Sequence, residues 1–398
     1  MQRPRHDALL IGSIVLVLAF VASSLAQPAG AQRGLTSAAV AAASPELLAR
    51  LRADPFTFFR FINRAWTERV CQAFADVPDP AIVRLHGDAH VEQFALTKDA
   101  WGLDDFDDSI RGPTFIDIVR FLGSIDLATR QRGWTRERDA LWDRFLEGYR
   151  RGLSDPDYHP PEPAIVHEMR KQAPVAGAAY LAWGEGQMRP MDESELALVG
   201  EAVEALERLI RRDRSDLAAG YFTIVRAGWL RTGIGSATTR KVLIRVQGPT
   251  VDPSDDQLLE AKEVTNLEGV DCVEGPTTQP AVRVIAGARQ LGRLKHDILA
   301  VGPTLLIPTA ADRAAHWVDW WVRSWEPSYL EVTVTDLRSA DDLADIVFDS
   351  GVQLGAGAVI GVRQQALASV TRLEGRLKKE TAALVEEMLA EWRQLRDR

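Results

Sequence analysis

Two short segments of the sequence carry the residues best suited to chemistry. Residues 86–94 read His-Gly-Asp-Ala-His-Val-Glu-Gln-Phe, and residues 103–108 read Leu-Asp-Asp-Phe-Asp-Asp. Clustered carboxylates repel one another, so they usually need a cation or several hydrogen-bond donors. A phosphoryl-transfer site can be built from a loop Asp, an amide soon after it and an Asp-Phe pair. In such a site one Asp accepts a hydroxyl proton, and the amide and the second Asp hold Mg²⁺. The spacing therefore favours functional roles for Asp88 and Asp105.

The acidic cluster also has a structural interpretation, as a solvated acidic turn accompanied by a capping His. We favour that interpretation for Asp104 and Asp108. The run His86-x-Asp88-x-His90 also suggests a dinuclear metal hydrolase, but the later histidines lie in no ligand motif. We expect His90 to brace the loop by hydrogen bonds rather than to bind a metal.

Other enzyme classes find little support. Gly233-x-Gly235 lacks the third glycine of a dinucleotide-binding fingerprint, and a predicted strand follows where that fingerprint needs a helix. The sequence contains no Ser or Cys nucleophile elbow.

The amino-acid composition further limits the classes of protein to which the chain can belong. The chain has 398 residues, of which 46% are hydrophobic, so it can bury a large core or two medium ones. Its 47 Lys and Arg against 56 Asp and Glu give a net charge of −9, and we therefore expect no nucleic-acid partner. Two cysteines exclude a disulfide-rich scaffold and a four-cysteine zinc site.

The N-terminus has the pattern of a targeting segment. Arg3 and Arg5 precede an uncharged apolar run over residues 9–25, and small residues follow it. We interpret residues 1–31 as a cleaved signal peptide or, alternatively, an uncleaved membrane anchor; a wrongly assigned start codon is the third reading. The signal-peptide and membrane-anchor interpretations both predict an extracytoplasmic protein, secreted or periplasmic. In that compartment Cys71 and Cys272 could form a disulfide, but the sequence alone leaves their pairing open.

The helices and strands that must position these residues can be predicted from the spacing of apolar residues and from the residues that break helices and strands. The prolines within residues 154–163 predict a loop, and Asp192-Glu-Ser-Glu resembles a capping-box start of a helix. The aromatic stretch over residues 56–61 fits a buried helical face. We predict helices over residues 38–52, 116–125, 196–210, 281–299 and 362–396, and strands over 81–85, 222–230, 241–247 and 258–264.

Several of these motifs together resemble the phosphotransferase core of aminoglycoside and choline kinase-like proteins and, more closely, the bacterial domain-of-unknown-function family DUF2252. The resemblance covers most of residues 45–360 and is strongest over residues 54–120. It is carried by Asp54-Pro-Phe-Thr-Phe-Phe-Arg60, His86-Gly-Asp-Ala-His90, Asp105-Phe-Asp-Asp108, Gly112-Pro113, Asp117-Ile-Val-Arg120, Gly233-Ile-Gly-Ser236 and Glu260-Ala-Lys-Glu-Val264.

The resemblance implies an α+β, two-lobed protein-kinase-like fold with permuted segment order, in which the catalytic-loop segment precedes the small antiparallel β lobe. It places Asp88 and His90 in the catalytic loop, with Asp88 as the base and Asp117 bracing it. Gln93 and Asp105 would bind Mg²⁺. In the β lobe, the resemblance implies that Gly233 and Gly235 cover the phosphates of ATP or another nucleoside triphosphate and that Lys262 holds its α- and β-phosphates.

Three departures from the family pattern bear on activity. Gln93 stands where the family has Asn, so the amide oxygen is displaced by about one carbon–carbon bond. Ala286 stands where the family often has Glu, which would leave Lys262 without an orienting partner if that Glu pairs with the lysine. Residues 354–358 lack the charged groups of the family's Leu-Ala-Arg-Ala-His run. These changes point toward weak or absent catalysis.

We therefore predict a signal or anchor over residues 1–31, a helical lobe over 38–215, a β-rich nucleotide lobe over 216–335 and returning helices over 336–398. The predicted function is exported phosphoryl transfer from a nucleoside triphosphate to a small-molecule or protein hydroxyl. The alternative is an exported pseudokinase that binds a ligand or partner without turnover. A membrane tether at the N-terminus is expected if the segment is not cleaved.

Overall fold

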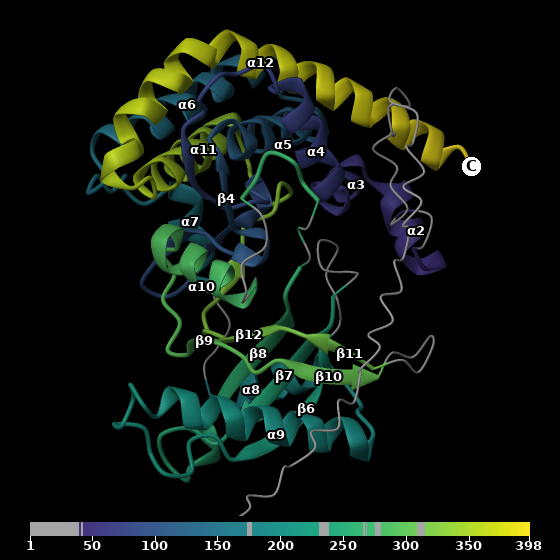
Figure 1. Ribbon diagram of the computed structural model, residues 1–398, viewed down its shortest axis with the longest axis vertical. Helices are drawn as coiled ribbons and strands as arrows, with labels where there is room; N and C mark the ends of the chain where they lie inside the picture. The colour runs from purple at the N-terminus through teal and green to yellow at the C-terminus, as the bar shows by residue number, and fades with distance from the viewer. Residues whose placement is uncertain are drawn as a thin grey trace, which may run out of the picture. The chain divides into compact units, whose positions relative to one another are not determined.

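The computed structural model describes residues 40, 43–172, 177–230, 239–265, 267, 269–274, 280–308 and 315–398. Helices and small antiparallel sheets make up this part of the chain (Figure 1), which confirms the α+β class. The predicted targeting segment and the predicted phosphate-covering residues Gly233 and Gly235 lie outside the described residues. Within the described part, no helix is both long and apolar enough to cross a membrane.

The helices are α2 (Pro45–Ala53), α3 (Pro55–Phe61), α4 (Asn63–Ala73), α5 (Phe115–Arg132), α6 (Arg138–Ser154), α7 (Ala164–Arg170), α8 (Ala178–Gly186), α9 (Glu193–Ile210), α10 (Pro280–Leu291), α11 (Ala340–Ala356) and α12 (Ile360–Arg396). The strands are β1 (Ile82–Leu85), β2 (Phe94–Leu96), β3 (Trp101–Leu103), β4 (Ile110–Pro113), β5 (Met188–Arg189), β6 (Ile224–Leu230), β7 (Lys241–Val246), β8 (Gln257–Glu263), β9 (Leu299–Val301), β10 (Leu305–Pro308), β11 (Ala315–Val318), β12 (Trp320–Ser324) and β13 (Leu330–Glu331).

Side chains at the helix starts explain where several helices begin. The Asp192 carboxylate accepts a hydrogen bond from the Glu195 backbone N–H, and the Glu195 carboxylate accepts one from the Asp192 N–H, both at 2.9 Å. This confirms the predicted capping box of α9. Asp54 caps α3 by accepting from Thr57 N at 2.7 Å, and the helix that follows buries Phe56, Phe58 and Phe59.

One predicted helix was wrong in its second half. The pattern predicted a helix over residues 281–299, but α10 ends at Leu291 and Leu299 begins strand β9. Gly292 follows the last helical residue, a position that glycine commonly takes at helix ends. The residues after it are needed to bring β9 alongside β12, where Leu299 pairs with Arg323.

Strands β5, β6, β7, β8, β12 and β9 form one six-stranded antiparallel sheet in that order. Lys262 on β8 lies opposite Lys241 on β7 and opposite Trp321 on β12. Directly opposed residues project from the same face of a sheet, so these three side chains form one row across three strands. The alternate residues, such as Val242 and Val322, pack with α9, which lies across the other face in Figure 1.

Helix α5 is the centre of the helical part of the chain. Its residues from Phe115 to Thr129 are buried, and α12 and α6 pack against it (Figure 1). Helices α6 and α11 approach very closely because glycines line their contact. A Cβ added to Gly148 would lie 2.2 Å from the carbonyl oxygen of Phe348, so a larger residue there would force the two helices apart. Helix α6 packs in turn against α5, from which Asp117 and Arg120 project.

A disulfide joins Cys71 on α4 to Cys272, with a Cα–Cα distance of 5.6 Å. The pairing that the sequence left open is therefore present in the structure. It links two positions 201 residues apart and fastens the segment after β8 to the helical part of the chain.

We predict that removing this disulfide destabilises the protein by about 2–5 kcal/mol, because the link restricts the unfolded chain. Denaturant unfolding of the Cys71→Ser/Cys272→Ser variant should show a lower midpoint than the oxidised wild type. Reductant should lower the midpoint of wild type and leave that of the double variant unchanged. Equal midpoints for the two oxidised proteins would contradict the prediction.

Candidate functional site

The segment His86–Asp88 is held in place by the side chain of Asp117 on α5. The Asp117 carboxylate accepts hydrogen bonds from the backbone N–H groups of His86 at 2.7 Å and Gly87 at 2.9 Å. The bracing role predicted for Asp117 is thus confirmed. Gly87 has a φ of 86°, and a Cβ there would lie 2.0 Å from the Asp108 carbonyl oxygen, so only glycine fits between the two acidic segments.

His86 joins the loop to the acidic cluster. Its Nε2 lies 2.8 Å from the carbonyl oxygen of Asp104, and its Nδ1 lies 3.3 Å from the backbone N–H of Asp88. A carbonyl only accepts and an N–H only donates, so these partners make Nε2 the donor and Nδ1 the acceptor. His86, rather than His90, is therefore the histidine that braces this loop.

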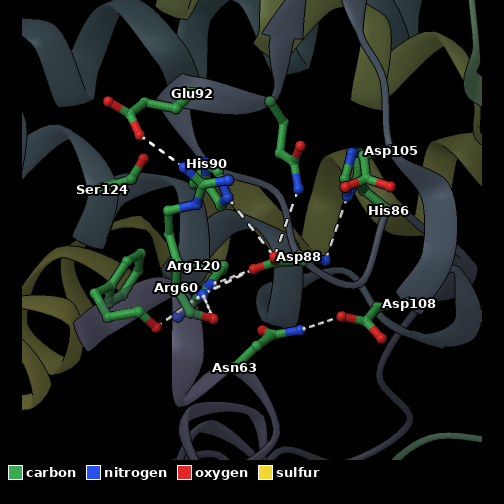
Figure 2. A network of polar contacts seen from close by, with 12 residues as sticks. Arg60, Asn63, His86, Asp88, His90, Glu92, Asp105, Asp108, Arg120 and Ser124 are labelled. Carbon is green, nitrogen blue, oxygen red and sulfur yellow. Dashed lines mark hydrogen bonds and ion pairs between the residues drawn. The ribbon is translucent and has the colours of Figure 1, made fainter. Parts of the chain in front are cut away.

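Asp88 is buried and paired with Arg120 of α5, as Figure 2 shows. Arg120 donates from Nε at 3.0 Å and from Nη2 at 2.7 Å, both to the same oxygen, Oδ1. Burial by itself raises the pKa of Asp88, but the charge of Arg120 outweighs it, with further help from His90, and lowers the pKa to about 2. Asp88 is therefore ionised at neutral pH, and its second oxygen carries no strong hydrogen bond.

Arg120 is a site residue that the sequence analysis did not single out. It is 1% exposed, its guanidinium stacks 3.7 Å above the Phe59 ring, and it also donates to the Phe59 carbonyl at 3.0 Å. The signal was present in the Asp117-Ile-Val-Arg120 motif, because residues three apart on a helix project from one face.

The structure places His90 and Gln93 beside the other Asp88 oxygen. His90 Nε2 lies 3.6 Å from Oδ2 and Gln93 Nε2 lies 3.5 Å from it. Both ring nitrogens of His90 are buried without a hydrogen-bond partner in the described chain, so the expectation that His90 braces the loop by hydrogen bonds was wrong. Its ring instead meets the Phe56 ring edge-on, 5.9 Å between centroids. Burial lowers the pKa of His90 to about 4, which keeps it neutral.

Lys262 and Asp105 meet although 157 residues separate them in sequence. Lys262 Nζ donates to Asp105 Oδ1 at 2.6 Å, so two residues that the family resemblance assigns to one nucleotide site are in direct contact. The Lys262 side chain is 2% exposed, whereas that of Asp105 is 33% exposed, so the carboxylate can be reached from solvent. Asp105 has a φ of 60° and a ψ of 62°, a left-handed conformation that is uncommon for Asp and tends to occur at functional sites.

Asp107 is a second carboxylate of this site, and the sequence analysis did not assign it. Its Oδ2 accepts from Lys262 at 3.1 Å, while its Oδ1 is buried with no hydrogen-bond partner in the described chain. Burial and the neighbouring charge of Asp105 raise the pKa of Asp107, whereas Lys262 holds the pKa of Asp105 well below its usual range despite burial. The family motif Asp-Phe-Asp contained the signal, because it places an acid on both sides of Phe106.

Asp104 and Asp108 have structural roles, but neither belongs to a solvated turn. Asp104 is 3% exposed and accepts from Arg323 Nη1 on β12 at 2.7 Å. Arg323 also donates from Nε to Glu260 on β8 at 2.9 Å. Asp108 is half-buried and accepts from Asn63 Nδ2 at 2.9 Å (Figure 2). The expectation of solvent exposure was wrong because the partners of these carboxylates, a cation for Asp104 and an amide for Asp108, come from elements remote in sequence.

Helix α10 supports the acidic segment without supplying a carboxylate to Lys262. Its Arg283 donates to the carbonyl oxygens of Asp107 and Ser109, both at 2.8 Å, and to that of Thr265 at 2.6 Å. In the residues that the structure describes, the hydrogen bonds of Lys262 go to Asp105 and Asp107 alone. The orienting partners of this lysine thus come from the acidic cluster, and Ala286 leaves no gap in its hydrogen bonding.

The donor set fits a divalent cation that shares its coordination with a ligand. Among the described residues, no three His, Cys, Asp or Glu side chains gather into a ready-made metal site. Mg²⁺, however, is commonly held by one or two carboxylates together with phosphate oxygens and water. Asp105, with its accessible side chain, and Asp107, with its unpaired oxygen, provide such a pair.

A cavity of about 770 Å³ lies elsewhere, between α9 and the six-stranded sheet. Most of its lining is apolar, with Val203, Leu206, Val242 and Val322 among the residues around it. Alternation along β7 and β12 puts Val242 and Val322 on the sheet face opposite Lys262, and Val203 and Leu206 of α9 pack against that face. The apolar part of the cavity therefore lies on the sheet face away from the acidic cluster, although Lys241 is also among the residues that line it.

The described part of the chain has an α+β fold. Its candidate site is rich in buried charged groups and lies between the loop braced by Asp117 and the six-stranded sheet. The family model described as "Uncharacterized protein conserved in bacteria (DUF2252)" matches residues 40–173, which include the loop, the acidic cluster and α5. The match supports the DUF2252 part of the resemblance over these residues. No curated protein and no solved structure matches the chain.

We predict that Arg120→Met destabilises the protein by about 3–5 kcal/mol, because it leaves the buried Asp88 carboxylate without its cation. Adding Asp88→Asn should recover much of that loss, since the unpaired charge is then gone. Urea unfolding of the two single variants and the double variant measures this coupling. Additive effects of the two substitutions would show that the pair contributes nothing as a pair.

Proposed function

We propose that the protein is a phosphotransferase that moves a phosphoryl group from a nucleoside triphosphate to the hydroxyl of a small molecule or protein. The observation that carries the proposal is the ion pair of Lys262 with Asp105 at 2.6 Å. It brings a strand lysine and a candidate metal-binding carboxylate together, next to a loop whose Asp88 is ionised. A kinase-like site needs these three groups in one place.

In this proposal Asp88 orients the acceptor hydroxyl. One of its oxygens is committed to Arg120, and the other faces His90 and Gln93, where a hydroxyl could donate to it. With a pKa of about 2, Asp88 is a weak base. It therefore acts mainly by fixing the hydroxyl and accepting its proton late, after the bond to phosphorus has begun to form.

Asp105 and Asp107 would hold Mg²⁺, which supplies positive charge against the phosphate oxygens when it is bound. Lys262 keeps both carboxylates in place by bonding to each of them. His86 and Arg283 fix the backbone on which the two carboxylates are carried, through the carbonyl oxygens of Asp104 and Asp107. The site is thus organised before a ligand arrives.

A binding module without turnover is the second candidate, and two observations favour it. The Gln93 amide nitrogen lies 3.5 Å from Asp88, so this side chain turns toward the base. Lys262 is also fully engaged by the acidic cluster, which leaves none of its hydrogen bonds directed elsewhere in the described structure. Both features suit a site that binds a nucleotide or partner and leaves it unchanged.

We predict that Asp105→Asn weakens Mg²⁺-dependent nucleotide binding by roughly ten- to hundredfold, because one charge-assisted contact is lost. Asp88→Asn should leave binding nearly unchanged and abolish turnover if turnover exists, since Asp88 contacts the acceptor. Calorimetric titration with Mg²⁺·ATP, together with ATP consumption, separates the two effects. Nucleotide binding by Asp105→Asn equal to that of wild type would refute the assignment.

The Gln93→Asn variant serves as the internal control for this assignment. It should tighten metal-dependent binding if Gln93 occupies a metal-ligand position. Wild type that binds no nucleotide at any Mg²⁺ concentration would remove the phosphotransferase proposal and leave the binding module as the function to test.

The same proposal places the mature protein outside the cytoplasm. The apolar segment over residues 9–25 and the Cys71–Cys272 disulfide support it, because disulfides persist mainly in oxidising compartments. We predict a mature N-terminus near Gln27 or Gln32 in an extracytoplasmic fraction, readable by N-terminal sequencing or intact mass. An intact Met1 on a soluble cytoplasmic protein would overturn the export proposal.

A further inference from the structure

Lys241 is a buried lysine that the roles described above leave unused. It is 9% exposed and lies directly opposite Lys262 in the pairing of β7 with β8. The two side chains therefore project from the same face of the sheet. Two ammonium groups placed side by side in a buried site repel each other, so the fold keeps Lys241 there at a cost in stability.

The two lysines differ in what they contact. Lys262 donates to Asp105 and Asp107, at 2.6 and 3.1 Å. Lys241, in contrast, has neither a hydrogen bond nor an ion pair with any described residue, and Glu260, Asp105 and Asp107 attract it only from a longer distance. A buried cation with no partner of its own lacks the compensation that structural cations normally receive. This imbalance points to a partner that is not part of the chain.

We propose that Lys241 binds a phosphate group of the nucleotide's polyphosphate chain, whereas Lys262 serves to hold Asp105 and Asp107. The inference rests on the proposed nucleotide site and assigns its phosphate-binding cation to a different residue from the one the family resemblance implies. A lysine ammonium binds phosphate as a compact point charge. Lys241 has its charge available for this, because no carboxylate of the described chain is bonded to it.

The balance of charge around Lys241 also sets a condition for binding. The side chains of Asp104, Asp105, Asp107 and Glu260 face those of Lys241, Lys262 and Arg323, as the ion pairs and electrostatic neighbours of these groups show. Among these side chains, the carboxyl groups outnumber the lysine and arginine groups by one. A polyphosphate is then attracted only after a divalent cation has offset the carboxylates. Binding through Lys241 is therefore expected to require Mg²⁺.

The test compares Lys241→Met with wild type in calorimetric titrations of the full chain. The probes are Mg²⁺·ATP, Mg²⁺·tripolyphosphate and AMP. Lys241→Met should bind Mg²⁺·ATP roughly ten- to hundredfold more weakly, with little change for AMP. Lys241→Arg, which keeps the charge, should recover part of the affinity. Lys171→Met is the matched control, since its exposed lysine pairs with Glu168, and it should bind all three probes as wild type does.

The outcomes separate the inference from the proposal on which it rests. Wild-type affinity of Lys241→Met for Mg²⁺·ATP would overturn the role of Lys241 and leave the nucleotide site standing. Wild type that binds tripolyphosphate but neither nucleotide would refute the nucleotide site, and a loss of that binding in Lys241→Met would still support a phosphate site at Lys241. Absence of binding for every probe would overturn both.

Thermal unfolding distinguishes a ligand-binding role from a structural one. A lysine kept for a ligand carries an unpaired buried charge, so Lys241→Met should unfold at the same temperature as wild type or at a higher one. Mg²⁺·ATP should raise the unfolding temperature of wild type more than that of the variant. A Lys241→Met protein that fails to fold, or that melts well below wild type, would show that Lys241 is structural and would overturn the inference.

Discussion

Compensation of buried negative charge is the constraint on which this structure depends. Asp104, Asp105 and Asp107 lie close together in one turn, and each takes its cation from the six-stranded sheet: Arg323 for Asp104, and Lys262 for the other two. Without those cations, the turn could not be buried, because unpaired carboxylates in a protein interior are too costly. The ion pairs therefore connect the sheet to the loop-bearing helical part and position the candidate site.

Further polar contacts fix the positions of the loop and of the acidic turn relative to each other. Asp117 holds the backbone of the loop, His86 connects the loop to the acidic turn, and Arg283 holds the turn from the other side. Each uses backbone groups that would otherwise be buried without partners. One oxygen of Asp107 can therefore stay without a hydrogen-bond partner among the described residues, because its neighbours are fixed by other residues.

Sequence patterns predicted what depends on nearby residues. The capping box of α9 was found because its two residues lie within one turn, and the strand before His86 was found from its own short apolar run. The bracing by Asp117, which lies 31 residues from His86, came only from the family resemblance. The burial of Asp104 was missed because its cation lies 219 residues away, and spacing along the chain carries no information about such distances. That Lys262 and Asp105 belong to one site followed only from the family resemblance, and the position of Lys241 opposite Lys262 required the strand register.

The order of the segments along the chain has a consequence for biosynthesis. The acidic turn is made first, and the lysine and arginine that neutralise it emerge from the ribosome 157 and 219 residues later. Until then the carboxylates of the turn lack the cations that pair with them in the folded structure, and unpaired carboxylates favour water over a protein interior. The site is assembled only when β12 has been synthesised, so no truncated product that ends before this strand can hold the turn in its buried form.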